Sequence, residues 1–147
     1  MKYLVDTNIL LRMCEPNHSM YSIALEATET LLNHENKLYI APQNIVEFWN
    51  VATRPKDKNG LGMSTQKAQS EILKLETIFT LKLDLPDIHK QWFNLIVNYE
   101  VKGVNVHDTR LVAFALVHGL THILTFNVKD FKRYQEITVV SPKQLVA

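Results

Sequence analysis

The sequence of 147 residues contains little cysteine, glycine and proline. Cys14 is its single cysteine, which excludes an intrachain disulfide framework and suits a reducing compartment. Only four glycines and five prolines are present, so regular elements joined by short connections are expected.

Long hydrophobic runs and an excess of one charge are also lacking. The longest apolar run covers 111–117, whereas a membrane-spanning helix needs about 20 apolar residues. The first apolar run stops at Asp6, too early for the core of a signal peptide. With 16 basic and 15 acidic residues the net charge is +1, so any nucleic-acid contact must be local. We therefore expect a soluble, cytoplasmic protein that does not contact membranes.

What the chain does have is the composition of a folded domain. Hydrophobic residues make up 46% and charged residues 21%, which excludes a disordered or low-complexity chain. Its length fits one compact domain, so we expect a single domain over 1–147.

Strand-like and helix-like segments alternate along the chain. Short runs rich in apolar and β-forming residues predict strands over 3–5, 37–41, 80–84, 122–126 and 137–140. Helical spacing of apolar residues predicts helices over 22–33, 42–53, 65–79, 87–99 and 108–118. Ser64 is expected to cap the third helix, and Gly119 to end the last. This order predicts an α/β fold with a central, mostly parallel sheet flanked by helices, which places ligands at the carboxyl ends of the strands.

Acidic residues fall where the chain leaves that edge of the predicted sheet. Asp6 follows the first strand, Glu47 lies in the helix after the second, and Asp108 opens the most apolar helix. Asn127 and Asp130 follow the fourth strand. If the strands are parallel, these side chains can converge on one crevice.

Each acid alone also has an ordinary structural interpretation. Asp6 fits a turn or a helix N-cap, Asp108 fits an N-cap, and Asp130 fits a surface charge beside lysines. Glu47 belongs to a narrow polar stripe on its helix, which fits either a solvated face or one wall of a polar cleft. The stripe consists of Gln43, Glu47, Asn50 and Arg54. The functional interpretation therefore rests on the occurrence of all these acids together and not on any one of them.

Clustered carboxylates indicate a particular chemistry. Like charges held together repel, and some must take up protons unless cations neutralise them. Mg²⁺ prefers oxygen ligands, and one or two such ions activate water and stabilise phosphoryl transfer. The pattern therefore favours phosphodiester hydrolysis.

Four segments resemble the motifs of the PIN domain, most closely those of the VapC-type toxin ribonucleases of toxin–antitoxin pairs. These segments cover 5–10, 44–48, 107–113 and 124–131, in the family's order. The resemblance implies a three-layer PIN-like fold, endoribonuclease activity on RNA with Mg²⁺ or Mn²⁺, homodimers, and inhibition by a small cognate antitoxin.

The resemblance also implies a role for each matching residue. Asp6, Glu47 and Asp108 would bind metal directly or through water, and Asp130 would be the fourth acid. Asn8 and Thr125 would be polar neighbours. Many relatives have Asp at the position of Asn127, so the number of metals and the residue that completes the site stay open. Among the basic residues, Arg54 and Arg110 are the preferred RNA contacts.

Other functions fit parts of the sequence. A PIN-type nuclease of RNA maturation would need no antitoxin, and an interaction module could keep the fold after losing an acid at Asn127. A phosphatase for small molecules would share the metal chemistry. The pair His118 and His122 favours a structural role over a zinc site, because Gly119 separates them and no cysteine pair follows.

Overall fold

The computed structural model describes residues 1–147 and contains one five-stranded sheet. The strands lie in the order β3-β2-β1-β4-β5, and all four pairings are parallel. Their bounds are β1 Lys2–Val5, β2 Lys37–Ile40, β3 Thr80–Leu81, β4 His122–Leu124 and β5 Thr138–Val140. The predicted parallel α/β arrangement is confirmed, although β3 is shorter than the predicted strand.

Six α-helices connect and cover the strands. They are α1 Thr7–Met13, α2 Tyr21–Asn33, α3 Pro42–Thr53, α4 Thr65–Ile78, α5 Asp87–Asn98 and α6 Asn105–Val117. Short 3-10 helices follow at η1 Lys56–Lys58, η2 Val128–Asp130 and η3 Pro142–Gln144. The first helix, α1, has no counterpart among the predicted elements.

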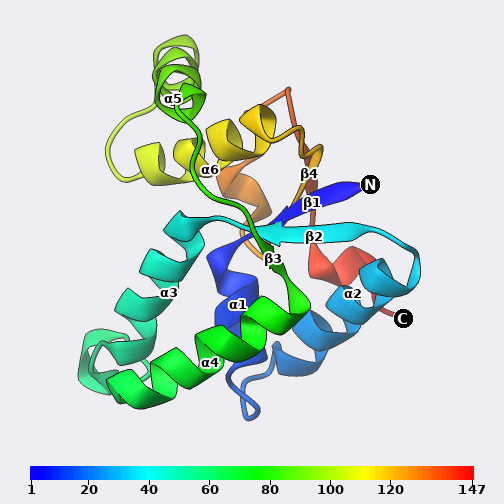
Figure 1. The fold of residues 1–147 in the computed structure, drawn as a ribbon, viewed down its shortest axis with the longest axis vertical. Coiled ribbons are helices and arrows are strands. Elements are labelled where there is room, and N and C mark those ends of the chain that lie inside the picture. The colour runs from blue at the N-terminus through cyan, green and yellow to red at the C-terminus, as the bar shows by residue number, and fades with distance from the viewer.

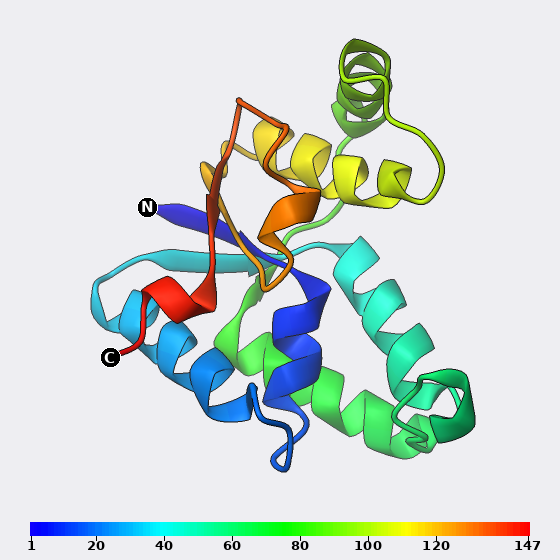
Figure 2. The ribbon, with the colours of Figure 1, turned by 180° about the vertical axis from the view of Figure 1, so that it is seen from behind.

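The sheet separates two apolar layers. Successive strand residues point to opposite faces, so Val5 and Leu4 belong to different core clusters. One cluster unites the sheet with α1–α4, and the other unites it with α5 and α6. Figures 1 and 2 show these helices on the two sides of the sheet. The predicted three-layer fold is thereby confirmed.

The helix ends follow local chemistry. The Ser64 hydroxyl accepts a hydrogen bond from the Lys67 N–H at the start of α4, as predicted. Gly119 follows α6 with a φ of +71°, the left-handed conformation that favours glycine after a helix. The predicted start of α6 is wrong, because the helix begins at Asn105 with Val104 as its N-cap residue. Asp108 therefore lies in the first turn of α6 and is not its N-cap.

The carboxyl ends of β1, β2 and β4 meet beside the starts of α1, α3 and η2. Figure 2 shows η2 close to the beginning of α1, and the Phe126 N–H donates to Asn8 Oδ1 there at 3.2 Å. None of the helices combines the length and the apolar character needed to cross a bilayer.

Candidate active site

A cavity of about 320 Å³ opens at the carboxyl edge of the sheet. We call it the carboxylate cavity, because three acidic side chains from different elements line it. Its lining consists of Asp6, Thr7, Asn8, Leu11, Glu47, Asn50, Val51, Asp108 and Asn127. The structure thus brings together the three acids that were predicted to bind metal.

Asp6 forms the base of this cavity, where β1 passes into α1. It is the N-cap residue of α1, and its Oδ1 accepts the Thr7 N–H at 2.8 Å. Its Oδ2 accepts the Thr125 hydroxyl at 2.7 Å and the Asn8 side-chain amide at 3.3 Å. Asp6 is only 6% exposed, and its hydrogen-bond donors are all neutral. They belong to the start of α1 and to the residue that follows β4. The capping and the functional interpretations of Asp6 are therefore compatible.

Glu47 is held through both of its carboxylate oxygens. Thr7 Oγ1 donates to Oε1 at 2.7 Å, and Gln43 Nε2 donates to Oε2 at 3.1 Å. The buried Asn44 supports this arrangement, because its Nδ2 donates to Thr7 Oγ1 at 3.1 Å. The polar stripe of α3 accordingly forms a wall of the cavity through Glu47 and Asn50.

Asp108 enters from the first turn of α6, and Gln43 joins that turn to α3. Gln43 Nε2 donates to the His107 carbonyl at 2.7 Å in addition to Glu47. Arg110 Nη1 donates to Gln43 Oε1 at 3.3 Å, while its Nη2 lies 3.5 Å from Asp84 Oδ1. Arg110 is thus connected to the acids through Gln43 and does not touch them directly.

Burial and mutual repulsion make two of the acids weak. Burial raises the pKa of Asp6 to about 6, against the opposing effect of the hydrogen bonds from Thr125 and Thr7. Burial and then the charge of Asp6, with smaller effects from Asp130 and Glu47, raise the pKa of Asp108 to about 7. Both carboxyl groups therefore change charge near neutral pH.

The donor set fits a hard divalent cation. Asp6, Glu47 and Asp108 form no ion pair with a basic side chain, so their charge is not neutralised within the chain. All their available ligand atoms are carboxylate oxygens, which Mg²⁺ and Mn²⁺ accept. No three acidic, histidine or cysteine side chains lie close enough together to form a ready-made metal site. A divalent ion held at this cavity would therefore have to keep several of its own waters, as Mg²⁺ does.

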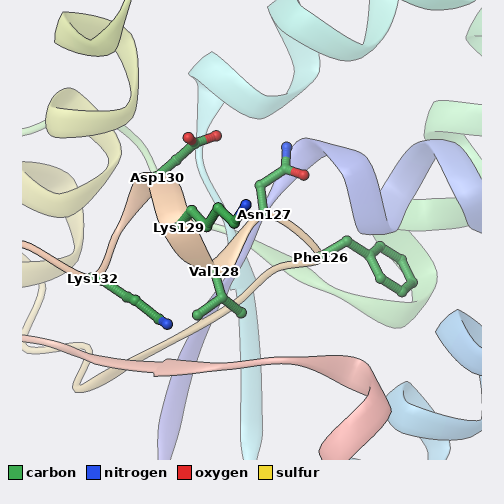
Figure 3. Close-up of a pocket in the computed structure, with 6 residues that line it drawn as sticks. All are labelled: Phe126, Asn127, Val128, Lys129, Asp130 and Lys132. Atoms are coloured by element: carbon green, nitrogen blue, oxygen red, sulfur yellow. The ribbon is translucent and has the colours of Figure 1, made fainter.

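Asn127 lies between the carboxylate cavity and a second cavity of about 500 Å³, which Asp130 also lines. We call the second one the lysine cavity; it is lined by Phe126, Asn127, Val128, Lys129, Asp130 and Lys132. Asn127 lines both cavities, while Asp130 lines only the lysine cavity. In Figure 3 the side chains of Asp130 and Asn127 project toward the same side, away from Val128 and Lys132. Asp130 is near enough for its charge to raise the pKa of Asp6 and Asp108.

The structure does not bring Arg54 into either cavity. Arg54 ends α3, and its Nη2 donates to the Asn59 carbonyl at 2.8 Å across the following loop. Its expected contact with RNA stays a prediction.

Three residues that hold the acids were not predicted as site residues. Thr7, Gln43 and Asn44 act through hydrogen bonds to Glu47 or to one another. Gln43 shares the polar stripe of α3 with Glu47, four residues away, and Thr7 directly follows Asp6. Asn44 carries no comparable signal, because its 0% exposure depends on the packing of α3 on the rest of the fold.

The fold and the acidic cavity together define a class of protein. The family model of the PIN domain matches residues 3–137, and the chain belongs to this family. A curated relative, Ribonuclease VapC1 of Rickettsia felis, is 35% identical over 71 residues. That match spans about half of each protein, 47% of this chain and 46% of the relative.

Solved structures share the fold at low identity. VapBC2 of Rickettsia felis, solved bound to a DNA fragment from its promoter, aligns with a TM-score of 0.71 at 19% identity. That alignment covers 96% of this chain and 98% of the other. VapC20 of Mycobacterium tuberculosis, a toxin that cleaves the sarcin-ricin loop, aligns with a TM-score of 0.66 at 14% identity. It covers 89% of this chain and 94% of the other.

Proposed function

We propose that this chain is a divalent-metal-dependent endoribonuclease and the toxin of a toxin–antitoxin pair. One observation carries the proposal: Asp6, Glu47 and Asp108 reach one cavity from three separate elements, with no basic side chain to neutralise them. Membership of the PIN family and the similarity to Ribonuclease VapC1 support RNA as the substrate.

Asp6, Glu47 and Asp108 would hold Mg²⁺ or Mn²⁺, directly or through water. The bound metal would supply an activated water and stabilise the charge that develops on the scissile phosphate. Thr7 and Gln43 orient Glu47, and Thr125 and Asn8 orient Asp6, so these two acids do not depend on the metal for their positions. Asp130 would add negative charge at the rim of the cavity.

Similar structures support a protein partner. They include VapBC structures from Rickettsia felis and Haemophilus influenzae and a toxin-antitoxin complex from Klebsiella pneumoniae. On this similarity we propose a small cognate antitoxin, and on the resemblance to the VapC-type toxins a homodimeric state and a cytoplasmic location. A short reading frame beside the gene, whose product copurifies with this chain and suppresses cleavage, would support the toxin role over RNA maturation.

The direct test is cleavage of structured RNAs by the purified protein in Mg²⁺, in Mn²⁺ and in EDTA. The control is the Asp6→Ala/Asp108→Ala double variant. We expect metal-dependent cleavage of RNA with blocked ends, and we expect the double variant to lose it. Cleavage that persists in the double variant would contradict the site. A folded protein that binds no Mn²⁺ in calorimetry and cleaves no RNA would support an interaction module instead.

A further inference from the structure

Asn127 lies at the junction of three cavities. It lines the carboxylate cavity, the lysine cavity and a third cavity of about 270 Å³. We call the third one the His18 cavity; it is lined by Asn8, Arg12, His18, Met20, Phe126, Asn127 and Lys143. Asn8 is shared by the carboxylate and His18 cavities, and Phe126 by the lysine and His18 cavities. The three hollows therefore adjoin one another around the segment 126–127, and we call them together the groove.

The charge along this groove changes sign. The carboxylate cavity is lined by three acids and no base, whereas each of the other two cavities contributes basic side chains. Lys129, Lys132 and Lys143 form no ion pair within the chain. Arg12 is different, because Glu15 already neutralises it. Lysines without an ion-pair partner therefore line both of the cavities that share Asn127 with the carboxylate cavity.

The lysine side of the groove is held by buried anchors. Phe131 and Tyr134 are 0% and 2% exposed, and they fix the segment that carries Lys129 and Lys132 to the core of the α6 layer. In Figure 3 Lys132 and Asp130 point in opposite directions, so the acid does not neutralise this lysine. An anion can therefore reach the Lys132 ammonium group without displacing a partner.

The other side of the groove offers two donors. His18 Nδ1 accepts the Met20 N–H at 3.0 Å, which leaves the His18 Nε2–H free to donate. Lys143 lies in η3, where the Ser141 hydroxyl accepts the Lys143 N–H at 3.3 Å. An imidazole N–H and an ammonium group are both suitable donors to phosphate oxygens.

We propose that the groove is the path of the RNA backbone, with phosphates bound by Lys129 and Lys132 on one side of the carboxylate cavity and by His18 and Lys143 on the other. This inference rests on the proposed function, and it adds the residues that bind the phosphates flanking the cleaved bond. Phosphate contacts of this kind position a nucleic acid without reading its sequence. The choice of RNA would then depend on other contacts.

Binding and cleavage are measured separately to test the groove. The binding probe is a fluorescein-labelled single-stranded RNA of 20 nucleotides and mixed sequence, titrated in EDTA at several salt concentrations by fluorescence anisotropy. The variants are Lys129→Gln/Lys132→Gln and Lys143→Gln. The charge-matched control is Lys2→Gln/Lys37→Gln, because these exposed lysines begin β1 and β2 at the opposite edge of the sheet.

For a single strand, each lost phosphate contact makes the negative slope of log K against log salt shallower by about 0.7. We expect the slope to become shallower by about 1.4 in the double variant and by about 0.7 in Lys143→Gln, with the control unchanged. Equal losses in the control and in the groove variants would overturn the groove, as would slopes that none of the variants alters. The same slope changes with a DNA 20-mer would support a groove that recognises phosphate and not ribose.

Failure of the proposed function gives a different pattern. If the groove variants alter RNA binding but the wild-type chain cleaves no RNA in any metal, the groove stands and the nuclease assignment fails. If the wild type cleaves RNA in Mn²⁺ while all lysine variants bind and cleave as it does, the nuclease stands and the groove fails.

Discussion

Asp6 and Asp108 belong to one cavity but differ in their surroundings. Asp6 accepts hydrogen bonds from Thr7, Thr125 and Asn8, whereas Asp108 accepts none within the chain. Replacing Asp6 therefore disturbs several contacts, while replacing Asp108 changes mainly the charge. Asp108 is the better residue for separating catalysis from folding.

We expect Asp108→Asn to lower the cleavage rate at least 100-fold while the far-UV circular dichroism stays unchanged. The amide keeps the shape of the side chain but cannot bind a divalent cation as a carboxylate does. Cleavage is measured in Mn²⁺ on the RNA used for the wild type. The control is Asp57→Asn, the same chemical change at an exposed position in η1, which should cleave normally.

The raised pKa of Asp108 also predicts that the stability of the wild type depends on pH, and that Asp108→Asn removes part of this dependence. The folded-state pKa of Asp108 is raised to about 7, so the folded chain binds more protons than the unfolded chain between about pH 4 and pH 7. Without metal, the free energy of unfolding should therefore decrease as the pH rises through this range. Because Asp108 is partly exposed, we expect Asp108→Asn to be more stable than wild type by about 1–2 kcal/mol at pH 8.

Urea unfolding in EDTA at pH 8 and pH 4.5 measures this difference, and the advantage of the variant should shrink at the lower pH. An advantage of equal size at both pH values would show that repulsion among the acids is not its cause.

Thr7 is expected to act as a positioning residue for Glu47. Thr7→Val keeps the shape but removes the hydroxyl that donates to Glu47 and accepts from Asn44. A buried donor left without its partner costs about 1–3 kcal/mol, so we expect that loss of stability together with weaker Mn²⁺ binding in calorimetry. Thr7→Ser should restore the Mn²⁺ affinity, because it restores the hydroxyl. Normal Mn²⁺ affinity in a folded Thr7→Val protein would contradict the positioning role.

At the scale of elements, α6 carries Asp108 into the cavity, and its far end depends on one glycine. Gly119 has a φ of +71°, and a Cβ placed there would meet nothing within 4 Å. The cost of a side chain at this position therefore comes from the backbone conformation alone.

We expect Gly119→Ala to lower the free energy of unfolding by about 1 kcal/mol. Gly119→Asn should lower it less, because asparagine tolerates the left-handed conformation better. Thermal unfolding measures both changes, and the cleavage rate at 25 °C should not change, because Gly119 lies at the opposite end of α6 from Asp108. A greater loss in Gly119→Asn than in Gly119→Ala would contradict the backbone explanation.

At the scale of the whole molecule, the sheet joins the two apolar layers, so residues 1–147 are expected to unfold as one cooperative unit. Any ion that binds only the folded chain then raises the melting temperature of the whole protein. An ion bound by the acids of the carboxylate cavity should therefore change the melting temperature of the whole protein.

We expect Mn²⁺ to raise the melting temperature more at pH 8 than at pH 5, because protons compete with metal for Asp6 and Asp108. Scanning fluorimetry with and without 1 mM Mn²⁺ provides the measurement. The Asp6→Asn/Asp108→Asn variant should lose the increase at pH 8. An undiminished increase in this variant would place the ion elsewhere.

The α/β class and the strands at the site were predictable from the sequence, and so was the gathering of Asp6, Glu47 and Asp108 at one edge of the sheet. These features depend on local periodicity and on the rule that parallel strands place their carboxyl ends at one edge. The sequence did not show that Asp130 lines a neighbouring cavity instead. The polar stripe of α3 drew attention to Glu47 but left open whether this face meets solvent or a cavity, and the structure shows Glu47 lining the carboxylate cavity.

The hydrogen bonds that hold the acids, and the neighbouring cavities, could be seen only in the folded chain. Helix α1 is short and directly follows Asp6, so its seven residues give too little periodicity to distinguish a helix from a turn. The hydrogen bond from Thr7 to Glu47 spans 40 positions, and the one from Gln43 to the His107 carbonyl spans 64. Asn127 lines all three cavities, and their other lining residues come from segments that are far apart in the chain. Such contacts join residues far apart in the chain, and no local pattern of the sequence encodes them.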